Sequence, residues 1–214
     1  MKLLHIDSGI LGTASVSRQL SAAAVREWRA RHPDTQVTYR DLVAQPLSHL
    51  AGDQLFAAGA DPSQQSAEMR ATLAESEKVL QEFLDADVLV IGAPMYNFGI
   101  ASQLKAWIDR VAVKGKTFAY TEQGPRGLAG GKTVIIASAR GGHYGEGSPV
   151  AGWDHQEAYL RTVFGFLGVT DIRFLRAEGV NVSPEAKDKA IAAAHGNLTQ
   201  LVAGKAAAQA AALS

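Results

Sequence analysis

Short, continuously apolar segments alternate with amphipathic helical segments along this chain, and this alternation constrains the fold more than any other feature. The clearest apolar segment is residues 87–93, which is hydrophobic on both faces and is followed by Pro94. Such segments are typical of strands buried inside a parallel sheet. Four further strands are expected, at residues 2–6, 36–41, 132–137 and 171–176.

Helices are expected between these strands, at about residues 15–30, 66–84, 101–113 and 155–167, with a last helix capped by Ser183. Residues 46–63 read as a loop with a short helix, and residues 114–131 as a long irregular connection. Five strands that alternate with helices predict an α/β fold, a doubly wound five-stranded parallel sheet with helices on both faces.

Composition narrows the class of protein that this fold serves. The 214 residues suffice for one domain with a sizeable core, and 47% hydrophobic with 20% charged residues is a globular composition. The 21 basic and 21 acidic residues balance, which argues against nucleic acid or an anionic membrane as the main partner. The chain has no cysteine, so thiol chemistry is excluded and any redox function needs a bound group.

Neither a signal peptide nor an apolar run of the ~20 residues that span a bilayer is visible in the sequence. We therefore expect a cytoplasmic protein that is not inserted in a membrane.

Ligands of doubly wound sheets bind outside the carboxyl ends of the strands, where the strand order reverses. The loops expected at that edge are residues 7–17, 94–99 and 138–147. The first loop ends in Ser15 and Ser17 at a helix start, where two hydroxyls and unpaired N–H groups can face one anion. This pattern indicates a phosphate site, and an ordinary serine cap is the alternative.

The other two loops carry residues that suit a flat heteroaromatic ring. Residues 94–99 read Pro-Met-Tyr-Asn-Phe-Gly, so aromatic and sulfur groups can pack on ring faces while Asn97 bonds an edge. The alternative is a hydrophobic plug over the strand end. In the third loop Gly141 and Gly142 permit close approach of a ligand to the backbone, or make a flexible turn. His143 is either a substrate contact or a solvated loop residue.

Other catalytic motifs fail on inspection. Residues 130–133 resemble part of a nucleotide P-loop, but Arg126 stands where the pattern needs glycine, and the segment precedes a strand. The sequence contains no Gly-x-Ser-x-Gly elbow, and its six histidines form no pair at metal-ligand spacing. His5, inside an expected strand, is interpreted as a packed residue and not as a ligand.

Four segments together resemble the FMN-dependent NADH azoreductases, relatives of the NAD(P)H-quinone reductases with a flavodoxin-like fold. They are residues 15–21 (SVSRQLS), 94–98 (PMYNF), 118–125 (FAYTEQGP) and 139–142 (ARGG). They occur in the family's order over nearly the whole chain. The resemblance implies a single flavodoxin-like FMN-binding domain over residues 1–214, NADH or NADPH as co-substrate, and small aromatic azo compounds or quinones as acceptors. It also implies a homodimer with both active sites at the interface.

The resemblance implies roles for individual residues. The FMN phosphate would be held by Ser15, Val16 and Ser17. The isoalloxazine ring would be lined by Met95, Tyr96, Asn97 and Phe98. Its pyrimidine edge would be met by Ala139, Arg140, Gly141 and Gly142. The family often has serine where Gly9 and Ala139 stand, which puts a hydroxyl contact to the flavin in doubt at each position, and Gly9 is still included in the cofactor-binding set.

The expected connection at residues 114–131 is long for a compact domain, and such loops tend to be lids or partner contacts. We expect its Phe118 and Tyr120 to shape the substrate pocket with Phe98 and His143, above the flavin of the same subunit or of its partner. The alternative is that Phe118 and Tyr120 pin the loop to its own core.

The residues and the resemblance together predict an FMN-dependent oxidoreductase that reduces azo compounds and quinones with NAD(P)H in a ping-pong, two-electron cycle. No acid or base residue is named as essential, because the cofactor carries the chemistry. Three alternatives stay open: a quinone reductase with incidental azo activity, a flavodoxin-like electron carrier, and a phosphate-binding hydrolase. The sequence does not specify the physiological acceptor, the choice of NADH or NADPH, or assembly beyond a dimer.

Overall fold

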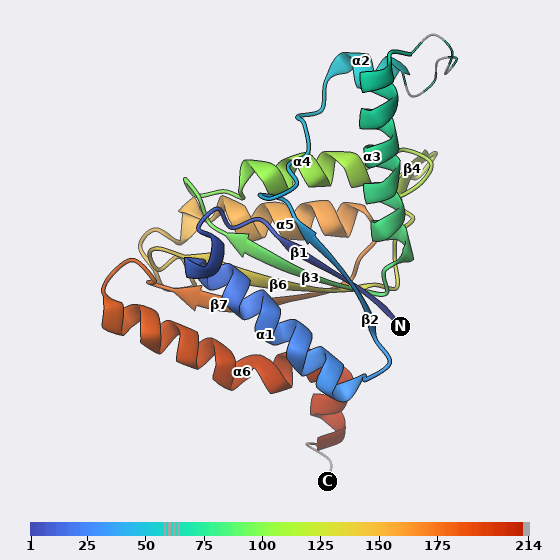
Figure 1. The fold of residues 1–214 in the computed structure, drawn as a ribbon. Helices are drawn as coiled ribbons and strands as arrows, with labels where there is room; N and C mark the ends of the chain where they lie inside the picture. The colour runs from blue at the N-terminus through green and yellow to red at the C-terminus, as the bar shows by residue number, and fades with distance from the viewer. Residues whose placement is uncertain (58, 60, 62, 64, 212–214) are drawn as a thin grey trace.

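The computed structural model describes residues 1–57, 59, 61, 63 and 65–211. Its five-stranded sheet has the order β2-β1-β3-β6-β7, and every neighbouring pair is parallel (Figure 1). The strands are β1 (Lys2–Asp7), β2 (Gln36–Asp41), β3 (Val88–Pro94), β6 (Thr133–Arg140) and β7 (Asp171–Glu178). This arrangement confirms the predicted doubly wound α/β fold, with the strand order reversing between β1 and β3.

Helices cover both faces of the sheet (Figure 1). One face carries α1 (Val16–Arg31) and α6 (Pro184–Ala211), and Leu20 and Leu198 belong to the core cluster on that side. The other face carries α3 (Ala67–Asp85), α4 (Ser102–Val111) and α5 (His155–Phe166), where Phe83, Trp107 and Phe164 are fully buried. Within the described residues, no helix combines the length and the apolar character needed to cross a bilayer.

Polar side chains fix where several helices begin, as the capping rules require. Ser66 accepts a hydrogen bond from the Met69 N–H at the start of α3. Asp154 does the same for two N–H groups at the start of α5. Ser183, the predicted cap of the last helix, accepts from the Ala186 N–H at 3.1 Å.

The connection predicted to be irregular contains a hairpin. Strands β4 (Phe118–Thr121) and β5 (Gly124–Gly127) pair antiparallel, and Gly124 supplies the positive φ that the turn needs. A short helix, α2 (Gly52–Ala57), lies in the segment predicted as a loop with a short helix. Two 3-10 turns complete the described elements, η1 (Gly12–Ala14) and η3 (Ala151–Trp153).

Strand β6 is longer than predicted, and β3 has the predicted length but lies one residue further along the chain. The ladder between β3 and β6 continues to the pair Pro94 and Ala139, so both residues are strand residues. Arg140 is likewise the last residue of β6, paired with Glu178, and not the first residue of a glycine loop. The third site loop therefore begins at Gly141.

Candidate active site

The three predicted site loops meet at the carboxyl edge of β1, β3 and β6. The Ile10 N–H of the first loop donates to the hydroxyl of Tyr96 in the second, at 3.1 Å. The Met95 N–H donates at 2.8 Å to the carbonyl of Ala139, two residues before the third loop. Hydrogen bonds thus link the three loops at this edge of the sheet.

The first loop presents a pair of buried serine hydroxyls. Ser15 is the N-cap of α1, yet its hydroxyl makes no capping bond and lies 3.0 Å from the hydroxyl of Ser17. The interpretation of Ser15 as an ordinary side-chain cap is therefore wrong. Gly9 approaches the pair so closely that a Cβ there would lie 2.3 Å from the Ser15 oxygen. Together with the N–H groups of the first helical turn, the two hydroxyls suit an anion.

The second loop is a strained turn. Tyr96 and Gly99 exchange both backbone hydrogen bonds at 3.0 Å, and the two residues between them, Asn97 and Phe98, have φ values of 47° and 69°. A positive φ is unusual for an aromatic residue and is commonly found where function requires it. The N–H of His155, the first residue of α5, donates to the Phe98 carbonyl at 3.0 Å and holds this conformation.

The Phe98 side chain is 42% exposed beside two aromatic residues that the sequence analysis did not select. Its ring packs edge-on against Trp153 and Tyr144, with centroids 5.5 and 6.3 Å away. Both residues lie in the stretch that follows β6. The strand order could have pointed to them, because it predicts that this stretch lies at the same edge of the sheet as Phe98. The result is an aromatic surface above the turn.

The third loop presents backbone donors. The carbonyls of Gly141 and Gly142 accept hydrogen bonds from the N–H groups of Asn181 and Gly179. Their own N–H groups make no hydrogen bond in the described part of the chain. Unpaired donors on adjacent glycines can approach a carbonyl or ring nitrogen of a ligand closely.

Arg140 points into the protein. Its side chain is 1% exposed and pairs with Asp154 at 3.0 Å, with Glu178 at 3.1 Å and with Glu157. Glu178 also accepts the Tyr144 N–H at 2.8 Å, so this ion cluster fixes the third loop. Arg140 can therefore touch a ligand only through its backbone.

The predicted substrate residues do not gather in one place within the chain. His143 lies in the third loop and is exposed. The Phe118 ring packs against Phe166 at the end of α5, 4.6 Å between centroids, whereas Phe98 bonds the first residue of that helix. A helix of 12 residues separates the two ends by about 17 Å. Tyr120, beside Phe118, is 65% exposed, so it is not pinned to the core of its own chain.

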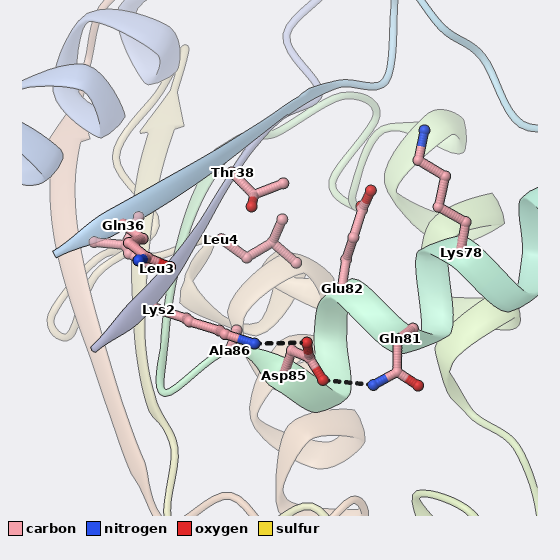
Figure 2. Close-up of a pocket in the computed structure, with 10 residues that line it drawn as sticks. All are labelled: Lys2, Leu3, Leu4, Gln36, Thr38, Lys78, Gln81, Glu82, Asp85 and Ala86. Carbon is pink, nitrogen blue, oxygen red and sulfur yellow. Dashed lines mark hydrogen bonds and ion pairs between the residues drawn. The ribbon is translucent and has the colours of Figure 1, made fainter.

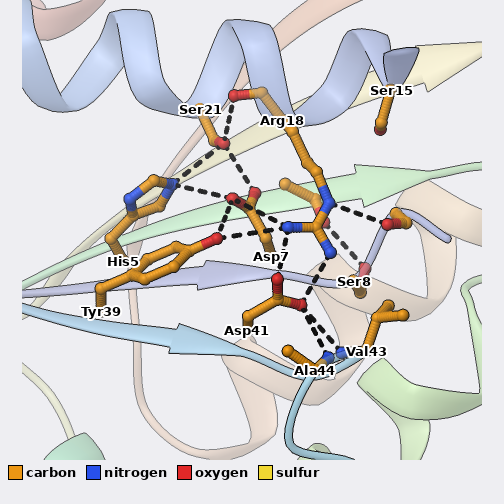
Figure 3. A network of polar contacts seen from close by, with 12 residues as sticks. His5, Asp7, Ser8, Ser15, Arg18, Ser21, Tyr39, Asp41, Val43 and Ala44 are labelled. Atoms are coloured by element: carbon orange, nitrogen blue, oxygen red, sulfur yellow. Dashed lines mark hydrogen bonds and ion pairs between the residues drawn. The ribbon is translucent and has the colours of Figure 1, made fainter. Parts of the chain in front are cut away.

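A polar network, buried at His5, Asp7 and Ser21 and exposed at Tyr39, lies under the first loop (Figure 3). The carboxylate of Asp7, at the end of β1, accepts hydrogen bonds from Ser21 and Tyr39 at 2.7 and 3.1 Å. His5, buried as expected, lies 3.0 Å from the same Ser21 hydroxyl. Arg18 of α1 forms a two-point contact with Asp41 at the end of β2. A hollow of about 660 Å³ opens beside this network.

Two pKa values in the network are displaced from their ordinary range. Hydrogen bonds from Arg18 lower the pKa of the Asp41 carboxyl to about 2, with the Val43 and Ala44 N–H groups adding to the effect. Burial, together with the nearby charge of Asp7, raises the pKa of Tyr39 to about 12. At neutral pH Asp41 is therefore ionised and Tyr39 is protonated.

Comparison with known proteins decides the family. A family model described as a flavodoxin-like fold matches residues 1–202. The chain belongs to this flavodoxin-like family. A relative from Sinorhizobium fredii, named FMN-dependent NADH:quinone oxidoreductase, is 56% identical over 204 residues, which cover 94% of this chain and 96% of the relative.

Two solved structures are similar to this flavodoxin-like protein over 94% of its length. The crystal structure of azoreductase AzrA is 30% identical, with a TM-score of 0.84 and 99% of that chain covered. An FMN-dependent NADH-azoreductase from Bacillus anthracis, solved in complex with FMN, is 25% identical, with a TM-score of 0.82 and 99% covered.

A second hollow of this flavodoxin-like protein, about 460 Å³, lies at the opposite edge of the sheet (Figure 2). It opens where β1 and β2 begin, and two of its lining residues, Lys2 and Asp85, form an ion pair with 2.8 Å between Nζ and Oδ2. None of the predicted site residues lines it. The described residues also contain no group of three or more His, Asp or Glu side chains that could hold a metal ion.

Proposed function

We propose that this protein is an FMN-dependent NADH:quinone oxidoreductase. The observation that carries the proposal is the surface at the carboxyl edge of the sheet, where a buried serine pair and a strained aromatic turn adjoin. The comparisons support it, because relatives that are 56% identical over nearly the whole chain carry the name FMN-dependent NADH:quinone oxidoreductase. The alternative of a hydrolase needs a metal cluster or an activated nucleophile. The described residues hold no metal-binding group, and the Ser21 hydroxyl beside His5 is buried and donates to Asp7.

The residues of this surface fit FMN. Ser15 and Ser17, with the N–H groups of Val16 and its neighbours in the first turn, would hold the phosphate, and the missing side chain of Gly9 leaves room for them. Met95, Tyr96, Asn97 and Phe98 would line the flat ring system. Ala139, Arg140, Gly141 and Gly142 would meet its pyrimidine edge through their backbone groups.

The chain's own groups bind and orient in this scheme. Bound FMN supplies the redox chemistry, since it can take a hydride from NADH and pass two electrons to an acceptor. The free N–H groups of Gly141 and Gly142 are the donors we assign to the edge where negative charge grows. The aromatic surface of Phe98, Tyr144 and Trp153 offers apolar ring faces to the nicotinamide and to the acceptor. No side chain is assigned as an acid or base.

A ping-pong order follows if both substrates use one slot in turn. Initial rates with NADH and a quinone should then give parallel lines in a double-reciprocal plot. Intersecting lines would contradict this order, because they indicate a ternary complex.

A homodimer belongs to the proposal, and the position of Tyr120 supports it. Tyr120 is exposed, and its neighbour Phe118 packs at the end of α5 that lies far from the Phe98 of the same chain, which supports a role for Tyr120 in the site of a second copy. Light scattering should give twice the mass of the 22.6 kDa chain. Tyr120→Ala should raise the KM for quinone severalfold and leave FMN binding unchanged. An unchanged KM and specificity would contradict this role.

The acceptor separates the remaining candidates. The value of kcat/KM for quinones should exceed that for azo compounds, in line with the names of the relatives that are 56% identical. A higher value for azo compounds would make azo reduction the main activity. A yellow protein without NADH-dependent turnover would instead support an electron carrier. We further propose a single domain, to which the match over residues 1–202 lends support, and a cytoplasmic location with access to NADH.

A further inference from the structure

Arg18 occupies a position where a cation is unfavourable. It is the third residue of α1, and the positive end of a helix dipole destabilises a basic side chain in the first turn. No acidic residue in that turn offsets its charge. The residue before it is Ser17 of the proposed phosphate site. Favourable contacts of the Arg18 side chain must therefore offset this destabilisation.

Those contacts join three separate elements (Figure 3). The Arg18 Nε donates to the Gly9 carbonyl in the first loop at 2.8 Å. Its two terminal nitrogens donate to the two carboxylate oxygens of Asp41 at the end of β2, each at 2.7 Å. One of them also donates to the Tyr39 hydroxyl at 3.2 Å. The side chain is 14% exposed, so these charged hydrogen bonds are largely shielded from water.

The charges around the loop make this contact relevant to an anion. Two carboxylates, Asp7 and Asp41, lie in the polar network under the first loop, and Arg18 faces both, with Asp7 at 4.0 Å. His5 also faces Asp7, at 3.5 Å, and Tyr39 is protonated. Arg18 also engages the Gly9 carbonyl oxygen, which would otherwise repel a phosphate beside it.

We propose that Arg18 is a positioning residue for the phosphate of the bound flavin. It fixes the loop at Gly9 and compensates the charges of the two carboxylates, so that they do not repel an anion bound at the serine pair. This inference rests on the proposed binding of FMN. It assigns no direct contact between Arg18 and the flavin.

The test compares FMN with riboflavin, which carries the same ring system without the phosphate. The apoprotein is titrated with each flavin, and the quenching of flavin fluorescence gives Kd. Arg18→Met keeps a long apolar stem but removes the charge and the donors. It should raise the Kd for FMN about tenfold and the Kd for riboflavin less than about twofold. Arg26→Met, an exposed arginine of the same helix without a hydrogen bond or ion pair among the described residues, should change neither.

Equal weakening of both flavins would overturn the inference, because it would show that Arg18 supports only the fold. No weakening would overturn it as well. If circular dichroism shows that the Met variant is unfolded, Arg18→Lys decides. It keeps the charge but loses the two-point contact with Asp41, and it must weaken the binding of FMN more than that of riboflavin. A folded wild-type protein that binds no FMN would instead refute the proposed function, which the wild-type titration reveals first.

Discussion

The ion pair between Asp41 and Arg18 should contribute measurably to stability, and Asp41→Asn tests it. The pKa of Asp41 is about 2 against an ordinary value of 3.8, chiefly because of the Arg18 hydrogen bonds. At about 1.4 kcal/mol per pKa unit, this difference corresponds to about 2 kcal/mol at pH 7. The pair is mostly buried, with side-chain exposures of 14% and 22%, so solvent screens it only in part. Asparagine still offers an oxygen to the Val43 and Ala44 N–H groups, which isolates the charge effect.

Urea unfolding followed by circular dichroism measures the free energy of unfolding of both proteins. The midpoint of thermal unfolding should also fall by roughly 4–8 °C in a chain of this size. Because the folded-state pKa is lowered, the wild-type advantage is complete above the unfolded value of about 4 and is lost as the pH falls through about 2. Asp34→Asn, an exposed aspartate just before β2, is the matched control. Equal stability of Asp41→Asn and wild type at pH 7, or a gap that persists at pH 2, would refute the reasoning.

Three further predictions concern the sheet, the hydrophobic core and the polar network. Gly92→Ala should lower the free energy of unfolding by about 1–3 kcal/mol in a urea titration, because the new Cβ would lie 2.2 Å from the Asp7 carboxylate. Gly52→Ala is the control, because a Cβ there meets no atom within 4 Å. Equal losses in the two variants would contradict a clash at Gly92. Trp107→Ala should cost about 3–5 kcal/mol, since the side chain is fully buried edge-on against Phe83; a loss under about 1 kcal/mol would mean that the site collapses around the cavity. Tyr39→Phe should remove one phenol that titrates near pH 12 in an ultraviolet titration. Because the folded-state pKa is raised, Tyr39 adds stability below its unfolded value of about 10, and this contribution is lost as the pH rises through about 12. An unchanged titration curve would exclude this assignment.

The apolar pattern was sufficient to predict the central strands β1, β3 and β6, because strands buried on both faces leave a continuous hydrophobic signal. The edge strand β2 is mostly exposed and was predicted from the alternation of its side chains. The β4–β5 hairpin left no such signal. Residues 124–127 read Gly-Pro-Arg-Gly, and close packing of Gly127 against the backbone of Gly168 accompanies the pairing. That contact joins positions far apart in the sequence, so local propensity could not reveal it.

The site was predictable where the chemistry is local. The serine pair and the aromatic turn lie in short stretches of sequence, and the structure brings these stretches together. The orientation of Arg140 was not predictable, because its partners Glu157 and Glu178 come from elements that follow it in the chain. Trp153 and Tyr144 escaped notice for the same reason, since only the fold places them beside Phe98.

An anaerobic titration of the purified, FMN-loaded protein with NADH tests the central claim most directly. The account predicts a flavin absorbance band near ~450 nm that bleaches with about one NADH per bound FMN and returns when a quinone is added. A protein that takes up no FMN, or whose flavin band persists in excess NADH, would contradict the account.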